Sequence, residues 1–286
     1  MNLPAPARFT APSGLGLAVY DWGGDGPPAL LAHPTGFHGR AWAPTAERLV
    51  AAGRKVWSFD FRGHGDSDPA PDGYAWSGFT DDALAVVDRL GIAGDPSLLA
   101  VGHSKGGTAL LLGALNRPGT YPRIWAYEPI VYPTDRSLDP QPDNPMSNAA
   151  RRRRAGWPSP DAAFAAYAAK PPLDALQADA LRAYVEGGLR EQADGTWTLK
   201  CAPADEAEVF AMGPANELWG QLSGVDCPVL VACGARTDAI NPKLAEMIVA
   251  RLPHGRLEIF ERLGHFGPME DPDACRTSML AFAATT

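Results

Sequence analysis

Residues 97–116 read SLLAVGHSKGGTALLLGALN, and this stretch decides the fold. An apolar run ends in GHSKG at 102–106, and a second apolar run with helical spacing follows it. The order predicts a strand over 97–101, a sharp turn that carries Ser104, and a helix over 106–116. Glycines leave room for the crossing chains, and the N-terminus of the helix favours negative charge beside the serine. The pattern is typical of a nucleophilic serine.

Strands and helices alternate on both sides of this turn. We expect further strands over 15–22, 29–32, 55–61, 124–127, 228–233 and 256–260. We expect further helices over 42–52, 76–90, 242–252 and 274–284. Alternation with short connections predicts a mostly parallel sheet with helices on both faces.

The alternation breaks between residues 131 and 224. This segment is rich in proline, alanine and charge, shows helical pieces over 161–169 and 174–186, and contains no expected strand. It holds many aromatic residues, which disordered linkers lack: Trp157, Phe164, Tyr167, Tyr184, Trp197, Phe210 and Trp219. We therefore expect a core domain of residues 1–130 and 225–286, with residues 131–224 as a mostly helical cap.

Composition excludes several classes of function. The chain has 286 residues, 45% of them hydrophobic, and a net charge of -8, which argues against a nucleic-acid-binding surface. No apolar run is long enough to cross a membrane, and the first residues do not resemble a signal peptide. The four cysteines show no metal-ligand spacing and are expected to be free thiols. These observations favour a cytoplasmic protein.

Three further motifs accompany the serine turn: HPTGF at 33–37, FRGHGDSD at 61–68 and GHF at 264–266. In this order they resemble the α/β-hydrolase superfamily, and in particular its capped branch of esterases, lactonases, cofactor-free haloperoxidase-like enzymes and C–C bond hydrolases. The resemblance implies an α/β-hydrolase fold, with the cap inserted after the sixth strand. It also implies an oxyanion hole made by the backbone N–H groups of Thr35 and Lys105.

A serine is a weak nucleophile unless a base lies within hydrogen-bond reach. Of the six histidines, we expect His265 to be that base, because it follows the last expected strand where the family places it. Structural roles are expected for His33 and His64, and a surface turn for His254. The side chain of His103 is expected to point away from the nucleophile.

The acid that supports His265 has two candidates. Asp238 follows the expected strand 228–233 in a loop that resembles the family's usual acid loop, and we prefer it. Glu128 follows the strand 124–127, where some members place the acid. Both satisfy the chain order serine, acid, histidine, so the order does not decide between them. Asp60, Asp66 and Asp68 are expected to serve turn and strand-end hydrogen bonds.

Substrate contacts are expected from the HPTGF loop, the GHF loop and the cap. The candidate residues are His38, Phe37, Phe266, Trp157 and Trp219. Phe164 and Tyr167 are further candidates, although packing within the cap is the commoner task of such aromatics. Lys105 and the run RRRR at 151–154 stand out in an acidic protein. We expect the arginines to face solvent and Lys105 to point outward or be salt-bridged. Contact with an anionic substrate is the alternative.

The expected reaction is two-step acyl transfer on a small-molecule carboxylic ester, with no metal and no organic cofactor. C–C hydrolysis, lactone hydrolysis and perhydrolysis use the same triad and stay open. A ligand receptor with the hydrolase fold is an alternative from another class. No nucleic-acid or membrane partner is expected, and a homodimer stays open.

Overall fold

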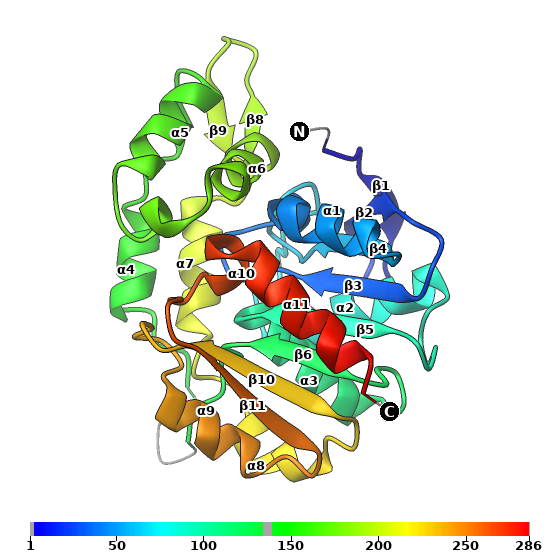
Figure 1. Cartoon of the computed structure of the whole chain (residues 1–286). Helices are drawn as coiled ribbons and strands as arrows, with labels where there is room; N and C mark the ends of the chain where they lie inside the picture. The colour runs from blue at the N-terminus through cyan, green and yellow to red at the C-terminus, as the bar shows by residue number, and fades with distance from the viewer. Residues whose placement is uncertain (1–2, 134–138, 286) are drawn as a thin grey trace.

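The computed structural model describes residues 3–133 and 139–285, so residues 134–138 of the expected cap lie outside the described residues. One large sheet runs through the molecule (Figure 1). Its eight described strands follow the order β1-β2-β4-β3-β5-β6-β10-β11. The pairs β1–β2 and β2–β4 are antiparallel and all later pairs are parallel, which confirms the expected sheet. The strands are β1 (Ala7–Thr10), β2 (Gly16–Gly23), β3 (Pro28–Ala32), β4 (Lys55–Asp60), β5 (Leu99–His103), β6 (Ile124–Tyr127), β10 (Val229–Gly234) and β11 (Gly255–Phe260).

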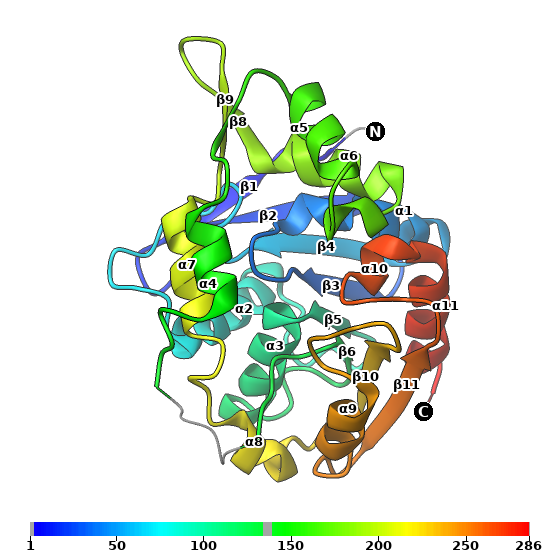
Figure 2. The same ribbon diagram turned by 90° about the vertical axis from the view of Figure 1, so that its left-hand side faces the viewer.

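Helices cover both faces of the sheet (Figure 2). One face packs against α1 and α11, and the other against α2, α3 and α9; each face buries its own apolar cluster. The core helices are α1 (Ala43–Ala51), α2 (Trp76–Leu90), α3 (Lys105–Asn116), α9 (Pro242–Val249), α10 (Gly267–Glu270) and α11 (Pro272–Ala283), with a 3-10 turn η1 (Gly39–Trp42). No helix in the described ranges is both long enough and apolar enough to cross a bilayer.

Four helices begin with the same local signal. In each, a side chain accepts a hydrogen bond from the N–H three residues later, and a proline occupies the next position, where no helical N–H partner is needed. The capping residues are Asn144, Ser159, Asn241 and Asp271. Helix starts are therefore encoded locally, in both the cap and the core.

The elements between β6 and β10 include the cap, at the upper left of Figure 1. The cap is built from α4 (Pro145–Arg151), α5 (Pro160–Ala168), η2 (Leu173–Ala175), α6 (Ala178–Gly188) and α7 (Pro203–Ala211). It also holds a small antiparallel sheet of β7 (Gly156–Trp157), β8 (Leu189–Glu191) and β9 (Trp197–Leu199), in the order β7-β9-β8. The expectation that this segment lacks strands is therefore wrong. Strands of two or three residues are too short to show a period of two.

Two short helices before β10 belong spatially to the core. These are α8 (Leu218–Gln221) and η3 (Leu222–Gly224), which lie beside α3 and α9, far from α5 and α6 (Figure 1). Trp219 packs in the apolar cluster of the α2, α3 and α9 face, with the Arg251 guanidinium 4.0 Å from its ring centroid. Residues 218–224, which the expected boundary assigns to the cap, therefore pack as part of the core.

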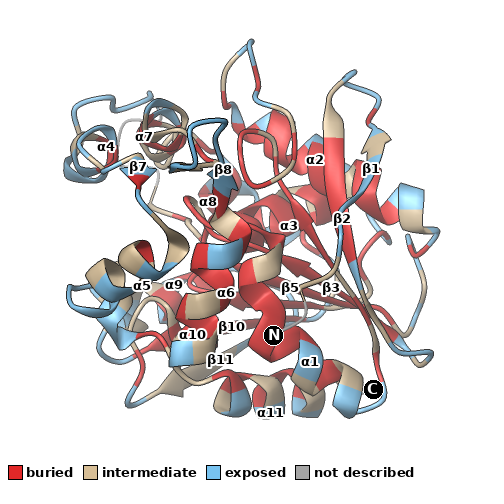
Figure 3. Cartoon of the chain, turned by 90° about the horizontal axis from the view of Figure 1, so that it is seen from above, coloured by how far each residue is buried: buried red, intermediate tan, exposed pale blue. Residues whose placement is uncertain are grey.

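The serine turn depends on close backbone contact. A Cβ on Gly102 would lie 2.5 Å from the backbone of Gly107, and a Cβ on Gly106 would lie 2.3 Å from the Ala32 carbonyl oxygen. Helix α3 therefore starts in direct contact with the ends of β3 and β5, a region that is almost wholly buried in Figure 3. Only glycine permits this approach.

The contact at Gly106 predicts a loss of stability on substitution. Gly106→Ala should lower the free energy of unfolding by about 1–3 kcal/mol, because the new methyl group overlaps fixed backbone. Gly220→Ala is the matched control, since a Cβ there meets nothing within 4 Å. Urea unfolding at equilibrium measures both. Equal midpoints for the two variants would contradict the packing described.

Candidate active site

Ser104 lies at the sharp turn between β5 and α3. Its backbone has φ 53°, and it is 5% exposed. Its N–H donates to the Tyr127 carbonyl oxygen at 2.8 Å, which fixes the turn to the end of β6. A non-glycine residue with positive φ is strained and persists only where its surroundings hold it. The sequence motif predicts a sharp turn at this serine, and the backbone of Ser104 between β5 and α3 has that form.

His265 follows β11 in a loop that Glu270 and Tyr127 hold by three hydrogen bonds. Glu270 accepts the N–H groups of Gly264 and Phe266 at 2.7 and 3.0 Å, and the Tyr127 hydroxyl donates to the Gly264 carbonyl at 2.7 Å. The imidazole ring lies 5.0 Å, between centroids, from the ring of His103, the neighbour of Ser104. The structure therefore brings His265 to the serine turn. Burial lowers the pKa of His103 well below its usual range, so this neighbour is neutral.

Glu128, not Asp238, contacts His265. The Glu128 Oε2 atom lies 2.6 Å from His265 Nδ1 and also accepts the Thr237 hydroxyl at 2.8 Å, while Oε1 accepts the Gly234 N–H at 3.0 Å. The Glu128 side chain is fully buried. Asp238 is exposed on the loop after β10, so the preference for it is corrected. That loop supports Glu128 through Thr237 instead of supplying the acid.

Strand topology explains why these groups meet. β5, β6, β10 and β11 are parallel neighbours, so the residues after each strand gather at one edge of the sheet. His103 pairs with Tyr127 in register, which places Ser104 beside Glu128. Glu128 has φ 45°, and together with Ser104 it makes up the non-glycine residues with positive φ in the described chain. Both strained residues lie in the candidate site.

The loop predicted to hold one oxyanion donor follows β3, and His33 orients it. His33 Nε2 accepts the Phe61 N–H at 3.1 Å, so its Nδ1 carries the proton and donates to the Pro34 carbonyl at 2.8 Å. In a trans peptide the next N–H, that of Thr35, points the opposite way. Among the described residues, neither the Thr35 N–H nor the Lys105 N–H donates to another group. Both donors are available to a ligand.

A pocket lies between this loop and the cap. The core contributes Gly36, Phe37, His38 and Gly65, and the cap contributes, among others, Arg153, Tyr167, Tyr184 and Lys200. The Phe37 ring lies 5.2 Å from that of Phe266, which in turn lies 5.2 Å from that of His265. The pocket therefore adjoins the histidine loop. Of the expected substrate contacts, Phe37 and His38 line this pocket, and Phe266 packs beside Phe37 without lining it.

Trp157 and Trp219, the expected contacts between the strands, do not line the pocket either. Trp157 is buried and packs on Tyr167, with 5.2 Å between their rings, so it supports a lining residue from behind. Trp219 lies in the core, as described above, and its expected role is corrected. The presence of an aromatic residue in the segment 131–224 does not predict whether its ring points into the pocket or into the core.

Arg153 is the polar centre of the pocket, so the expectation that the arginines at 151–154 face solvent is wrong for this residue. Its Nη1 donates to Glu206 at 2.7 Å, and its Nη2 donates to the hydroxyl oxygens of Tyr167, at 3.3 Å, and Tyr184. Glu206 rests against Gly36, where a Cβ would lie 2.2 Å from its Oε1. The neighbours Arg151, Arg152 and Arg154 are exposed, as expected. The partners of Arg153 lie up to 53 residues away, so no local signal distinguishes it.

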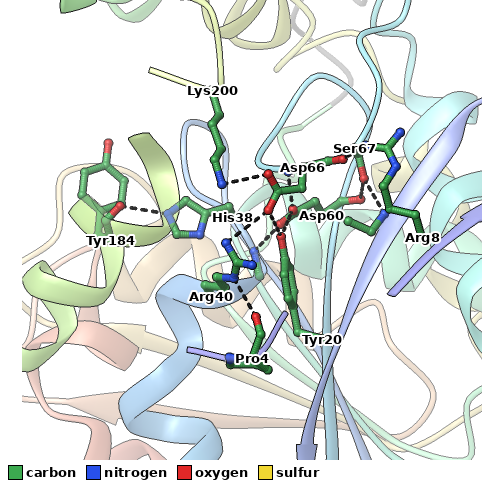
Figure 4. A network of polar contacts seen from close by, with 12 residues as sticks. Pro4, Arg8, Tyr20, His38, Arg40, Asp60, Asp66, Ser67, Tyr184 and Lys200 are labelled. Carbon is green, nitrogen blue, oxygen red and sulfur yellow. Dashed lines mark hydrogen bonds and ion pairs between the residues drawn. The ribbon is translucent and has the colours of Figure 1, made fainter. Parts of the chain in front are cut away.

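Figure 4 shows two of the polar contacts that join cap and core. Lys200 binds Asp66 at 2.8 Å, and His38 Nε2 donates to the Tyr184 carbonyl at 2.9 Å. Burial lowers the pKa of His38 to about 3, so the ring is neutral and donates a single proton. Asp60 accepts the N–H groups of Gly39 and Asp66. Asp60 thus makes the turn hydrogen bonds expected of it, whereas the Asp66 side chain binds Lys200 of the cap and Arg40.

Comparison with known proteins agrees with this geometry. A family model described as the alpha/beta hydrolase family matches residues 29–277. The chain is 28% identical over 277 residues, 90% of each sequence, to a non-heme chloroperoxidase of Kitasatospora aureofaciens.

Solved structures show the same fold. The crystal structure of E-2-(acetamidomethylene)succinate hydrolase has a TM-score of 0.81 and 21% identity, over 99% of this chain and 100% of that chain. The enol-lactonase of Burkholderia xenovorans LB400 has a TM-score of 0.72 and 20% identity, over 98% and 100%. The resemblance seen in the sequence is confirmed: the chain belongs to the alpha/beta hydrolase family.

Proposed function

We propose that this protein is a serine hydrolase that cleaves a small-molecule carboxylic ester by two-step acyl transfer. The observation that carries the proposal is the contact of buried Glu128 with His265 Nδ1, beside a strained serine and two available N–H donors. Glu128 holds the imidazole with its proton on Nδ1, which leaves Nε2 free to accept the Ser104 proton.

In the first step, Ser104 Oγ attacks the ester carbonyl carbon while its proton passes to His265 Nε2. The N–H groups of Thr35 and Lys105 stabilise the oxyanion, and loss of one such donor typically costs about a hundred- to a thousandfold in rate. His265 then protonates the departing alcohol. In the second step, water attacks the acyl-enzyme, gives its proton to His265, and the acid leaves as Ser104 regains a proton.

The pocket favours a substrate with acceptor oxygens. Because the hydroxyl oxygens of Tyr167 and Tyr184 accept from Arg153, their own protons point elsewhere, and no described residue accepts them. Lys200 also lines the pocket. Hydroxyl donors next to cations suit a carboxylate. We infer that an ester bearing a carboxylate is the preferred class; Lys105 is not a lining residue and plays no part in this contact.

Hydrolysis of p-nitrophenyl esters, from acetate to decanoate, tests the function. The wild type should turn over part of the series, and Ser104→Ala should lose this turnover because the acyl acceptor is missing. The chain-length optimum measures the acyl site. A wild type that is inert across the series would contradict the esterase proposal and favour C–C hydrolysis or a receptor.

The identity of the acid has its own test. Glu128→Gln should lower kcat about a thousandfold or more, because the amide cannot stabilise the charged imidazole and disturbs its tautomer. Asp238→Asn, the matched control, should stay within about twofold of the wild type, since Asp238 is exposed. Steady-state kinetics on one ester decides. The reverse pattern would restore Asp238.

The carboxylate preference is tested by removing a single hydroxyl. Tyr184→Phe should raise KM for a monomethyl dicarboxylate ester about tenfold or more, as a hydrogen bond to a charged group is lost. KM for the matching neutral diester should hardly change. Arg151→Ala, at an exposed arginine of the same run, is the control. Equal effects on both esters would contradict recognition of the carboxylate.

A further inference from the structure

Lys105 follows the nucleophile, and its side chain is buried in the core. It is 1% exposed, so the expectation of an outward or salt-bridged lysine is wrong. Its Nζ lies 4.5 Å from the Phe61 ring centroid and 4.6 Å from that of Phe79. Aromatic faces attract a cation without neutralising it. The ammonium is therefore enclosed by π surfaces at the start of α3.

The nearest polar atom is His64 Nε2, 3.4 Å from Nζ. His64 Nδ1 lies 2.8 Å from the Arg62 carbonyl, to which it can only donate, so Nε2 carries the lone pair that accepts from Lys105. Burial and the lysine charge lower the pKa of His64 well below its usual range. The histidine is thus a neutral acceptor and supplies no counter-charge.

No carboxylate of the described residues lies within ion-pair distance of Nζ. Titratable groups face it from several elements, and those of opposite sign are already engaged. Asp82 binds Arg62 at 2.7 Å, Glu206 binds Arg153 at 2.7 Å, and Asp60 accepts backbone N–H groups and the Tyr20 hydroxyl. The facing groups are His33, Asp60, His64, Asp82, Cys201 and Glu206. Lys105 has no counter-ion of its own.

A buried ammonium without a counter-ion lowers stability, because its desolvation is not compensated. Accordingly, burial lowers the pKa of Lys105 to about 7. The chain therefore holds, at the residue after the nucleophile, a group that is energetically unfavourable in the resting fold. Negative charge appears next to this residue only during the proposed reaction, when the oxyanion forms at the Lys105 N–H.

We propose that the Lys105 ammonium is an electrostatic positioning group for the oxyanion: its charge, left uncompensated in the free enzyme, is balanced by the tetrahedral intermediate. The proposal rests on the serine hydrolase function above. The backbone N–H of Lys105 touches the oxyanion, while its ammonium acts from behind through a dry, low-dielectric interior, where a charge acts most strongly. The aromatic rings keep water away from the ammonium.

Lys105→Met separates this role from a packing role. Methionine fits an aromatic box and removes the charge while keeping the length of the side chain. We expect kcat to fall about ten- to a hundredfold with little change in KM, since the charge acts only on the oxyanion. The unfolding midpoint should stay equal or rise. Lys55→Met, which removes a lysine 4.9 Å from the Trp57 ring and away from the site, is the matched control and should not change kcat.

The pH profile gives a readout that packing alone would not move. The ammonium is present at low pH and is lost as pH rises through about 7, so kcat of the wild type should decline above this pH. Lys105→Met should lack the decline. The pH dependence of stability gives a second readout. The pKa of Lys105 is lower in the folded protein than in the unfolded protein, so the free energy of unfolding of the wild type should rise relative to that of Lys105→Met between about pH 7 and 10. Any stability advantage of the variant should narrow over this range.

Phenylboronic acid tests the charge without turnover. It adds to Ser104 Oγ as a tetrahedral anion, with the serine proton passing to His265, and should bind Lys105→Met more weakly by a factor similar to the loss in kcat. If the wild type is active and Lys105→Met keeps its kcat, the inference about Lys105 is overturned. The same holds if the variant loses kcat but still shows the decline at alkaline pH. Both outcomes leave the proposed function standing. A wild type inert toward esters and boronic acid would overturn the proposed function, and the inference with it.

Discussion

The hydrogen bond from the Ser104 N–H to the Tyr127 carbonyl ties the end of β5 to the end of β6. It holds Ser104 in a strained backbone conformation, and it brings Glu128, the residue that follows β6, beside the serine turn. Glu128 in turn joins β10 through Gly234 and the histidine loop through His265. The parallel register of adjacent strands thus brings together groups that lie up to 161 positions apart, from Ser104 to His265. The position of each loop is fixed by the strand that precedes it.

The sequence predicts those features that short segments encode. The GHSKG turn needs glycines at fixed offsets, and the structure shows the backbone contacts that require them at Gly102 and Gly106. His265 could be chosen because it lies in the short loop after the last expected strand, where the family that the chain resembles places the base. The mostly parallel sheet follows from alternating strands and helices.

Features that depend on distant partners could not be predicted. Glu128 and Asp238 both follow strands that end at the same edge, and only the reach of each carboxylate to His265 Nδ1 separates them. Lys105 is charged, and charge normally indicates exposure; it is buried because Phe61 and Phe79, remote in sequence, enclose it. Arg153 lies within a solvent-facing run, and only Glu206 distinguishes it. Tertiary context overrides local pattern at each of these residues.

Gly36 carries a consequence for the breadth of the protein's chemistry. The Glu206 carboxylate rests on its bare Cα, and even a methyl group there would overlap that oxygen. Glu206 is hydrogen-bonded to Arg153, and Arg153 is hydrogen-bonded to Tyr167 and Tyr184. A side chain at position 36 would therefore have to displace these four residues together. The missing Cβ of Gly36 therefore sets how closely Glu206 of the cap approaches the loop after β3. Substitution of this one residue could therefore widen the pocket for bulkier molecules in proteins that descend from this one, while the reacting groups stay unchanged.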